Sequence, residues 1–197
     1  MREPVHLVVE GASEQNYLRA LLDVRYPGLF APQFSRKSGP NRKTSLVNLI
    51  EAARHEESLW QRSARGQVIW IVCDVDQNEV HQQLLCDWVN EATNHRSALQ
   101  SLALEGWLLQ HQKKPSRPSS ASAALKALTR QWPSYSKGCV IPPWVINNTD
   151  QACQRERQLV GPDGDGYWPK PGSSQLYRLI DYLDERAHRL RSPQVRT

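Results

Sequence analysis

The feature that most constrains this chain is an apolar run that ends in two acidic residues. Residues 68–73 are rich in β-branched and aromatic side chains, which is typical of a strand buried in a parallel sheet. Asp74 and Asp76 follow. They are two residues apart, so in an extended segment both side chains point to the same face. Ligands of α/β sheets bind at the carboxyl ends of the strands, and hard divalent cations prefer oxygen ligands. The pattern therefore predicts a site for Mg²⁺, or alternatively Mn²⁺, that includes Asp74 and Asp76.

A second run places another carboxylate in the same context. Residues 5–9 are apolar, and Glu10 and Gly11 follow them directly. Apolar residues then recur at helical spacing, which predicts a helix over 13–26 with Ser13 as its N-cap. Glu10 is therefore expected to serve as a metal ligand or a general acid or base. The alternative is a strand-end carboxylate that only caps the following helix.

The remaining pattern alternates strand-like and helix-like segments, which predicts an α/β fold with a mostly parallel sheet flanked by helices. A length of 197 residues suits one domain. We expect residues 1–112 to form its core and residues 113–197 to form a loop-rich helical extension of the same domain. Residues 97–105 fit either a strand or the start of a helix. Further strands are expected near 31–35 and 68–73, and further helices at 45–64, 79–93, 104–111, 121–131 and after 174.

The net charge of +5 suits a polyanionic partner. Two basic loops would be the contacts for nucleic-acid phosphates, and the alternative is that they are ordinary solvated loops. The candidate nucleic-acid-binding residues are Arg36, Lys37, Arg42 and Lys43 in the first loop and Lys113 and Lys114 in the second.

The composition also argues against several classes of protein. The four cysteines lack Cys-x-x-Cys spacing, so neither a zinc site nor a disulfide framework is expected. No apolar stretch approaches membrane-spanning length, and we expect a cytoplasmic protein without membrane contact. No phosphate-binding loop of the P-loop type and no Ser-His-Asp pattern is present.

The two carboxylate motifs together resemble the signature of the Toprim domain. In that family, a Glu-Gly at the end of one strand and an Asp-x-Asp at the end of a later strand hold Mg²⁺ for phosphodiester chemistry. Here Glu10 would be the catalytic glutamate and a metal ligand, with Asp74 and Asp76 as further ligands.

Three later segments narrow the resemblance to the RloB-like branch. Glu105, Trp107 and His111 occupy the positions of that branch's Glu, Trp and His, and residues 135–138 resemble its Tyr/Lys element with Lys137. Residues 171–174 resemble its Pro-Ser-Thr element. The resemblance runs from about residue 5 to residue 183 and implies supporting catalytic roles for Glu105, His111 and Lys137.

The resemblance implies a Mg²⁺-dependent nuclease that acts on RNA, such as tRNA, or on DNA in anti-phage defence. Relatives often accompany an ABC-type ATPase, which would then be the controlling partner. Residues 101–104 depart from the branch pattern, and this departure motivates a second hypothesis, a non-catalytic Toprim module that binds nucleic acid or regulates a partner. A phosphatase for small substrates stays open, whereas primase or strand-passage activity ranks last. The oligomeric state is left open.

Overall fold

A four-stranded parallel sheet organises the chain. The structure, a computed structural model, describes residues 2–35, 45–60, 67–75, 78–162, 164 and 166–192. The strands lie in the order β2-β1-β3-β4, and all three neighbouring pairs are parallel. Their bounds are β1 (Glu3–Val9), β2 (Phe30–Ser35), β3 (Ile69–Val75) and β4 (His95–Ser101).

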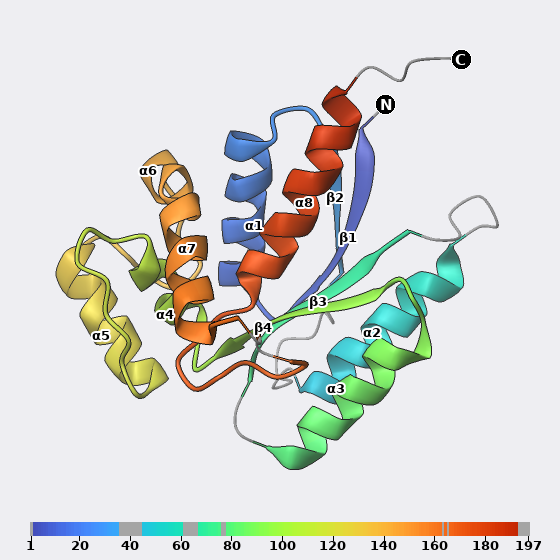
Figure 1. Cartoon of the computed structure of the whole chain (residues 1–197), viewed down its shortest axis with the longest axis horizontal. Coiled ribbons are helices and arrows are strands. Elements are labelled where there is room, and N and C mark those ends of the chain that lie inside the picture. The colour runs from blue at the N-terminus through green and yellow to red at the C-terminus, as the bar shows by residue number, and fades with distance from the viewer. Residues whose placement is uncertain are drawn as a thin grey trace.

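Helices cover both faces of this sheet (Figure 1). Helices α2 and α3 pack on one face, α1 and α8 pack on the other, and α4 to α7 gather beside α1 and α8. The predicted α/β fold with a parallel sheet flanked by helices is confirmed. The helix bounds are α1 (Ala12–Arg25), α2 (Leu46–Leu59), α3 (Glu79–Glu91), α4 (Leu104–Gln110), α5 (Ala121–Gln131), α6 (Pro143–Asn147), α7 (Thr149–Val160) and α8 (Leu176–Arg191).

Two hydrophobic cores lie on opposite sides of the sheet, and β3 contributes to both. Trp70 and Val72 belong to the core under α1 and α8, whereas Ile69 and Ile71 belong to the core under α2 and α3. Successive side chains of a strand point to opposite faces, so a strand buried on both faces has to be apolar throughout. This requirement explains the uninterrupted run that precedes Asp74.

The structure corrects several expected boundaries. Helix α1 begins at Ala12 with Gly11 as its N-cap, so Ser13 is not the cap. Strand β4 occupies His95–Ser101, so residues 97–101 of the range that fitted a strand or a helix start form a strand, which begins two residues before that range. Helices α6 and α7 were not expected at all. All four cysteines are free thiols. Of the helices within the described ranges, none combines the length and apolar character needed to cross a bilayer.

We expect Trp107→Ala to destabilise the chain strongly. Trp107 is 1% exposed and packs edge-on against the rings of Tyr17 and His111. Truncating a buried tryptophan leaves a cavity, which lowers the free energy of unfolding by about 3–5 kcal/mol. Urea unfolding measures this loss. Trp144→Ala is the comparison variant, because Trp144 is 39% exposed and makes an edge-on contact with Trp132, so its loss should be clearly smaller than that of Trp107→Ala. Equal losses for the two variants would contradict the assignment of Trp107 to the core.

Candidate functional site

Glu10 and Asp74 meet at the carboxyl edge of the sheet. Strands β1 and β3 are adjacent and in register up to Val9 and Val72, so each chain leaves the sheet at the same level. The Glu10 N–H donates to the carbonyl of Val72 at 3.2 Å, and the Asp74 N–H donates to Oε2 of Glu10 at 3.1 Å. The structure thus brings together two of the residues that the sequence proposed as metal ligands.

Glu14 joins them from the first turn of α1. It lies four residues after Glu10 and is only 6% exposed. The helix starts at once after the strand, because Gly11 takes the N-cap position. A Cβ atom at position 11 would stand 3.1 Å from Oε2 of Glu14, so glycine leaves room for this carboxylate.

A second helix brings Glu105. It lies in the first turn of α4, directly after the end of β4, and is 2% exposed. Tyr135 donates its hydroxyl hydrogen to Oε1 of Glu105 at 2.9 Å. Between β4 and α4, Leu102 has a φ of 92°, a region that residues with side chains rarely adopt. This tight turn lets Glu105 follow the strand so closely.

The loop that contains Lys137 is fastened to α1. The Gly138 N–H donates to Oγ of Ser13 at 3.0 Å, and Nδ2 of Asn16 donates to the Gly138 carbonyl at 2.7 Å. Gly138 has a φ of 76°, which favours glycine. Lys137 itself is exposed, and its positive charge favours the ionised forms of Glu10 and Asp74. Ser13 therefore holds the lysine loop rather than the helix end.

Neighbouring carboxylates oppose the ionisation of Asp74 and Glu14. Burial, followed by the charges of Glu14, Glu10 and Glu105, raises the pKa of Asp74 well above its usual value. Burial also raises the pKa of Glu10, against the hydrogen bond from the Asp74 N–H and the charge of Lys137. Burial and the charges of Glu10 and Glu105 raise the pKa of Glu14, although backbone hydrogen bonds oppose this rise. The four carboxylates therefore form one electrostatic group with an excess of negative charge.

The donor set fits a hard divalent cation. Oδ1 of Asp74 is buried and hydrogen bonds with no other described atom, which is unfavourable unless a further group approaches it. Carboxylate oxygens are the ligands that Mg²⁺ and Mn²⁺ prefer. Within the described ranges, no three side chains of His, Cys, Asp or Glu are already placed to bind one ion. Asp76, the third expected ligand, lies outside the described residues.

His111 does not join this group. It is 1% exposed, its Nδ1 lies 3.0 Å from the Trp107 carbonyl, and its Nε2 lies 3.3 Å from the Tyr17 hydroxyl. Its convergence with Glu105 required α4 to begin after Glu105, but α4 begins at Leu104. Burial lowers the pKa of His111 to about 4. A neutral, enclosed imidazole fits a core residue, and the proposed acid or base role receives no support from this geometry.

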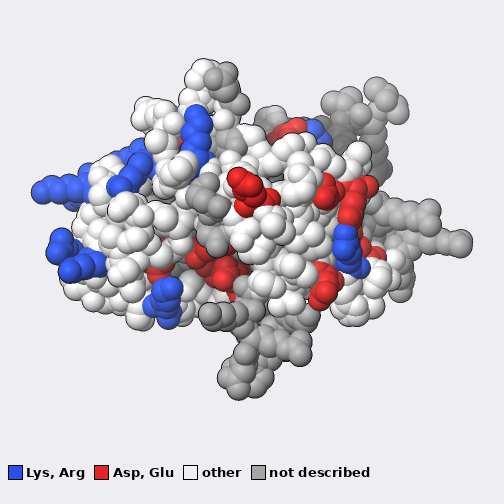
Figure 2. Space-filling view, turned by 90° about the horizontal axis from the view of Figure 1, so that it is seen from below, with Lys and Arg blue, Asp and Glu red and all other residues white. Residues whose placement is uncertain are grey.

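The predicted basic contacts divide into two sets. Arg36, Lys37, Arg42 and Lys43 lie outside the described residues. Lys113 and Lys114 are exposed on the loop that follows α4. Figure 2 shows Lys and Arg side chains concentrated at the end of the molecule where α5 lies in Figure 1, and Asp and Glu side chains nearer the middle.

Sequence reasoning missed Glu14 and the partner of Glu105. The motif Tyr135–Lys137 was noticed for its lysine, yet Tyr135 is the residue that binds Glu105. A signal for Glu14 was present, since it stands at the third helical position after the Gly11 N-cap. A glutamate at that position commonly turns back toward the start of its helix. Such a turn directs it toward the strand end that carries Glu10.

A parallel α/β sheet with buried carboxylates at its carboxyl edge defines the class of this protein, an α/β protein with a candidate cation site. The family model of RloB-like proteins matches residues 5–183. The chain therefore belongs to the RloB-like protein family. Comparison with curated proteins and with solved structures found no match.

His111 should make the stability of the fold fall in mild acid. Its pKa is about 4 in the folded chain and about 6.5 when unfolded, so between these values only the unfolded chain binds the proton. Stability therefore decreases as the pH falls from about 6.5 to about 4, by up to about 3 kcal/mol from this residue. Urea unfolding of wild type and His111→Gln across this range should show the smaller pH dependence in the variant. His188→Gln, at an exposed position, is the control, and parallel curves for wild type and His111→Gln would contradict the assignment.

Asp74→Asn should stabilise the chain when no divalent cation is present. The substitution removes a carboxylate whose ionisation is opposed by burial and by the charges of Glu14, Glu10 and Glu105, so the free energy of unfolding at pH 7 in EDTA should rise measurably. Asp87→Asn, on the exposed surface of α3, should change it by less than about 0.5 kcal/mol. A loss of stability in Asp74→Asn under these conditions would show that the carboxylate is already compensated within the fold.

Proposed function

We propose that this RloB-like chain is a nuclease of the Toprim type that depends on Mg²⁺ or Mn²⁺. The observation that supports it most is the group of Glu10, Glu14 and Asp74 at one sheet edge, with an unpartnered buried oxygen on Asp74. A purely structural role does not explain why these like charges lie together. Buried like charges at a ligand-binding edge are typical of functional sites.

Some of these residues would bind the cation, and others would position them or contact the substrate. Asp74 and Glu14 would hold the cation together with Glu10, whose Oε2 also accepts the Asp74 N–H. Asp76 is proposed as a further ligand from the sequence alone. A bound divalent ion supplies charge stabilisation to a phosphoryl group and lowers the pKa of a bound water.

Lys137 is proposed to contact the phosphate oxygens of the substrate. It is exposed, its loop is fixed to α1 through Ser13 and Asn16, and its charge reaches Glu10 and Asp74. A preorganised lysine beside the carboxylates stabilises charge that develops on a phosphoryl group. Glu105 orients this loop through Tyr135 rather than acting on the substrate directly.

The polymer is proposed to be RNA, such as tRNA, or DNA, in anti-phage defence under the control of an ABC-type ATPase. The net charge of +5 and the exposed Lys113 and Lys114 are consistent with contacts to phosphates. The family membership is consistent with the defence role, which rests on the resemblance given by the sequence.

A non-catalytic module is the second candidate. It is favoured by one observation, that the described residues hold no ready-made set of three metal ligands. Such a module would bind nucleic acid or a partner through the same face without cleaving a bond.

Cleavage assays with tRNA, single-stranded DNA and duplex DNA test the proposal. We expect cleavage with Mg²⁺ or Mn²⁺ and none in EDTA, with the partner ATPase added where the chain alone is inactive. Asp74→Asn, Glu10→Gln and Glu14→Gln should each lower the rate by at least about a hundredfold, because each removes charge that holds the cation. Lys137→Ala should lower it by about tenfold to a hundredfold, and Asp87→Asn should leave it unchanged.

Nucleic-acid binding separates the two candidates. If the chain binds these polymers but does not cleave them with either metal, with or without the ATPase, the non-catalytic module is correct. Cleavage that persists in EDTA or in Asp74→Asn would contradict the metal site itself.

A further inference from the structure

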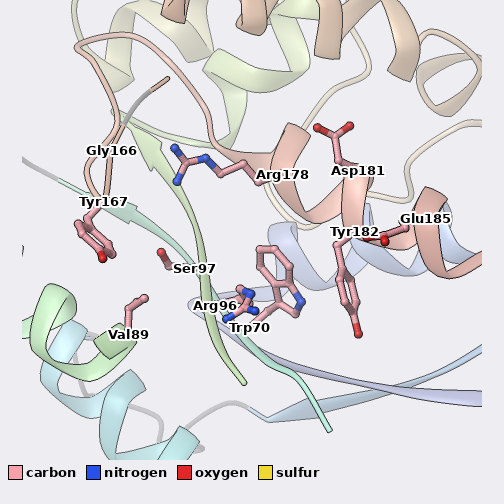
Figure 3. A pocket seen from close by; sticks show the side chains of 10 residues that line it. All are labelled: Trp70, Val89, Arg96, Ser97, Gly166, Tyr167, Arg178, Asp181, Tyr182 and Glu185. Atoms are coloured by element: carbon pink, nitrogen blue, oxygen red, sulfur yellow. The ribbon is translucent and has the colours of Figure 1, made fainter. Parts of the chain in front are cut away.

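A cavity lies on the opposite half of the sheet from the carboxylates. It has a volume of about 510 Å³ and lies against the first residues of β3 and β4. Figure 3 shows Arg178, Tyr182 and Asp181 from α8 on one side, Tyr167 on another, and Ser97 between them. Tyr167 contacts α3, where its hydroxyl donates to Oδ1 of Asn90 at 3.0 Å. None of these residues takes part in the proposed metal site.

The cavity opens onto the free edge of β4. Strand β4 is the last strand of the sheet, and part of its outer edge is already paired by the chain itself. Ser174 pairs antiparallel with Gln100, the Ser101 N–H donates to the Ser173 carbonyl at 2.9 Å, and the Gln175 N–H donates to the Leu99 carbonyl at 2.7 Å. The next step would fall opposite Ser97, but the chain turns into α8 at Leu176.

Ser97 consequently presents an open position for backbone pairing. Backbone groups of alternate residues in an edge strand point outward, and Leu99 and Ser101 use theirs outward. Ser97 is in the same phase, so its N–H and C=O point away from β3 and toward the cavity that it lines. No described segment pairs with them. Unpaired edge groups are a template for an added strand.

The side chains of Arg96 and Arg178 place positive charge beside this position, and some of their N–H groups have no acceptor among the described residues. Nη1 of Arg96 donates to the carbonyls of Thr93 and His95. Nε of Arg178 donates to the Tyr177 hydroxyl at 3.4 Å. Among the described residues, neither arginine forms an ion pair with a carboxylate. The two acids of the cavity wall are occupied, because Asp181 pairs with Arg157 and Glu185 pairs with Arg189.

Side-chain direction specifies what would fit. Arg96 is opposite Trp70 in the sheet and faces α8, whereas Ser97 is opposite Ile71 and faces α3 with Val89. A residue paired with Ser97 would point its side chain toward Val89, where an apolar group fits. Its two neighbours would point toward Arg96 and Arg178, where carboxylates fit.

We propose that the cavity beside Ser97 binds an extended segment of a partner protein, in which acidic and apolar residues alternate, as an added strand on β4. Backbone pairing supplies the affinity, and the two arginines select the acidic side chains. The proposal does not depend on nuclease activity at the carboxylate edge.

Amide-resolved NMR of the full ¹⁵N-labelled chain tests it with a peptide probe, acetylated and amidated, of alternating glutamate and valine. In the free chain, the Ser97 amide should exchange with solvent faster than the Ala98 amide, which points toward β3. Saturation with the peptide should slow exchange at Ser97 by at least about tenfold. The same peptide with lysine in place of glutamate should produce no such protection.

Two pairs of variants sharpen the result. Ser97→Pro removes the outward N–H and is tolerated on an edge strand, so binding should be lost, whereas Ser97→Ala keeps the N–H and should bind as wild type. Arg96→Ala combined with Arg178→Ala should weaken binding by at least about tenfold, because two charge-assisted contacts disappear.

Three outcomes would overturn the proposal. The Ser97 amide stays unprotected at saturating glutamate peptide, or the lysine peptide protects it equally. Alternatively, AMP or a short single-stranded RNA shifts the Arg96 and Arg178 side-chain signals while the acidic peptide does not, which would assign the cavity to a phosphate ligand.

Discussion

The repulsion among buried and half-buried carboxylates at the end of β1 and β3 is the constraint on which the rest of this structure depends. Glu10 and Asp74 are fixed there by the sheet, and Glu14 and Glu105 arrive from the first turns of two helices. Removing these charges from water is unfavourable unless positive charge or N–H donors compensate. Within the described residues, Lys137 and the Asp74 N–H supply part of that compensation. A divalent cation would supply the remainder.

Residues from the second half of the chain complete the carboxylate site and cover part of the β4 edge of the sheet. Tyr135 and Gly138 fasten the lysine loop to Glu105 and Ser13, and the segment 173–175 pairs with the end of β4. Glu156, buried in α7, accepts hydrogen bonds from the Ser174 N–H at 3.0 Å and from Arg117 at 2.9 Å. The free position at Ser97 follows from where the segment 173–175 leaves β4 and the chain turns into α8.

The sequence predicted the elements whose patterns are local. The apolar run of β3 and the spacing of α1 identified the sheet and placed Glu10 and Asp74 at its edge. Helix α7 escaped prediction because its buried face includes the polar residues Thr149 and Glu156, which weaken the hydrophobic period. The start of strand β4 was not predicted, because the strand begins with the polar residues His95-Arg96-Ser97. His95 is buried and stacks on Trp88.

The candidate site was predicted only in part, since its remaining members depend on contacts distant in sequence. Tyr135 reaches Glu105 across 30 positions, and Gly138 reaches Ser13 across 125. His111 is a different case, because the family motif implies a catalytic role for it, whereas the fold encloses it between Tyr17 and Trp107. No local pattern distinguishes an enclosed histidine from a reactive one.

The most direct test of the central claim is anomalous diffraction from crystals of the full chain soaked in Mn²⁺. A cation that compensates the carboxylates should give an anomalous peak in contact with Asp74 and Glu14, at the edge that also carries Glu10. The peak should disappear in crystals of Asp74→Asn. If soaked crystals instead show the Lys137 ammonium or ordered water against Oδ1 of Asp74, with no anomalous signal, the carboxylate group is compensated by the protein itself and the metal site is contradicted.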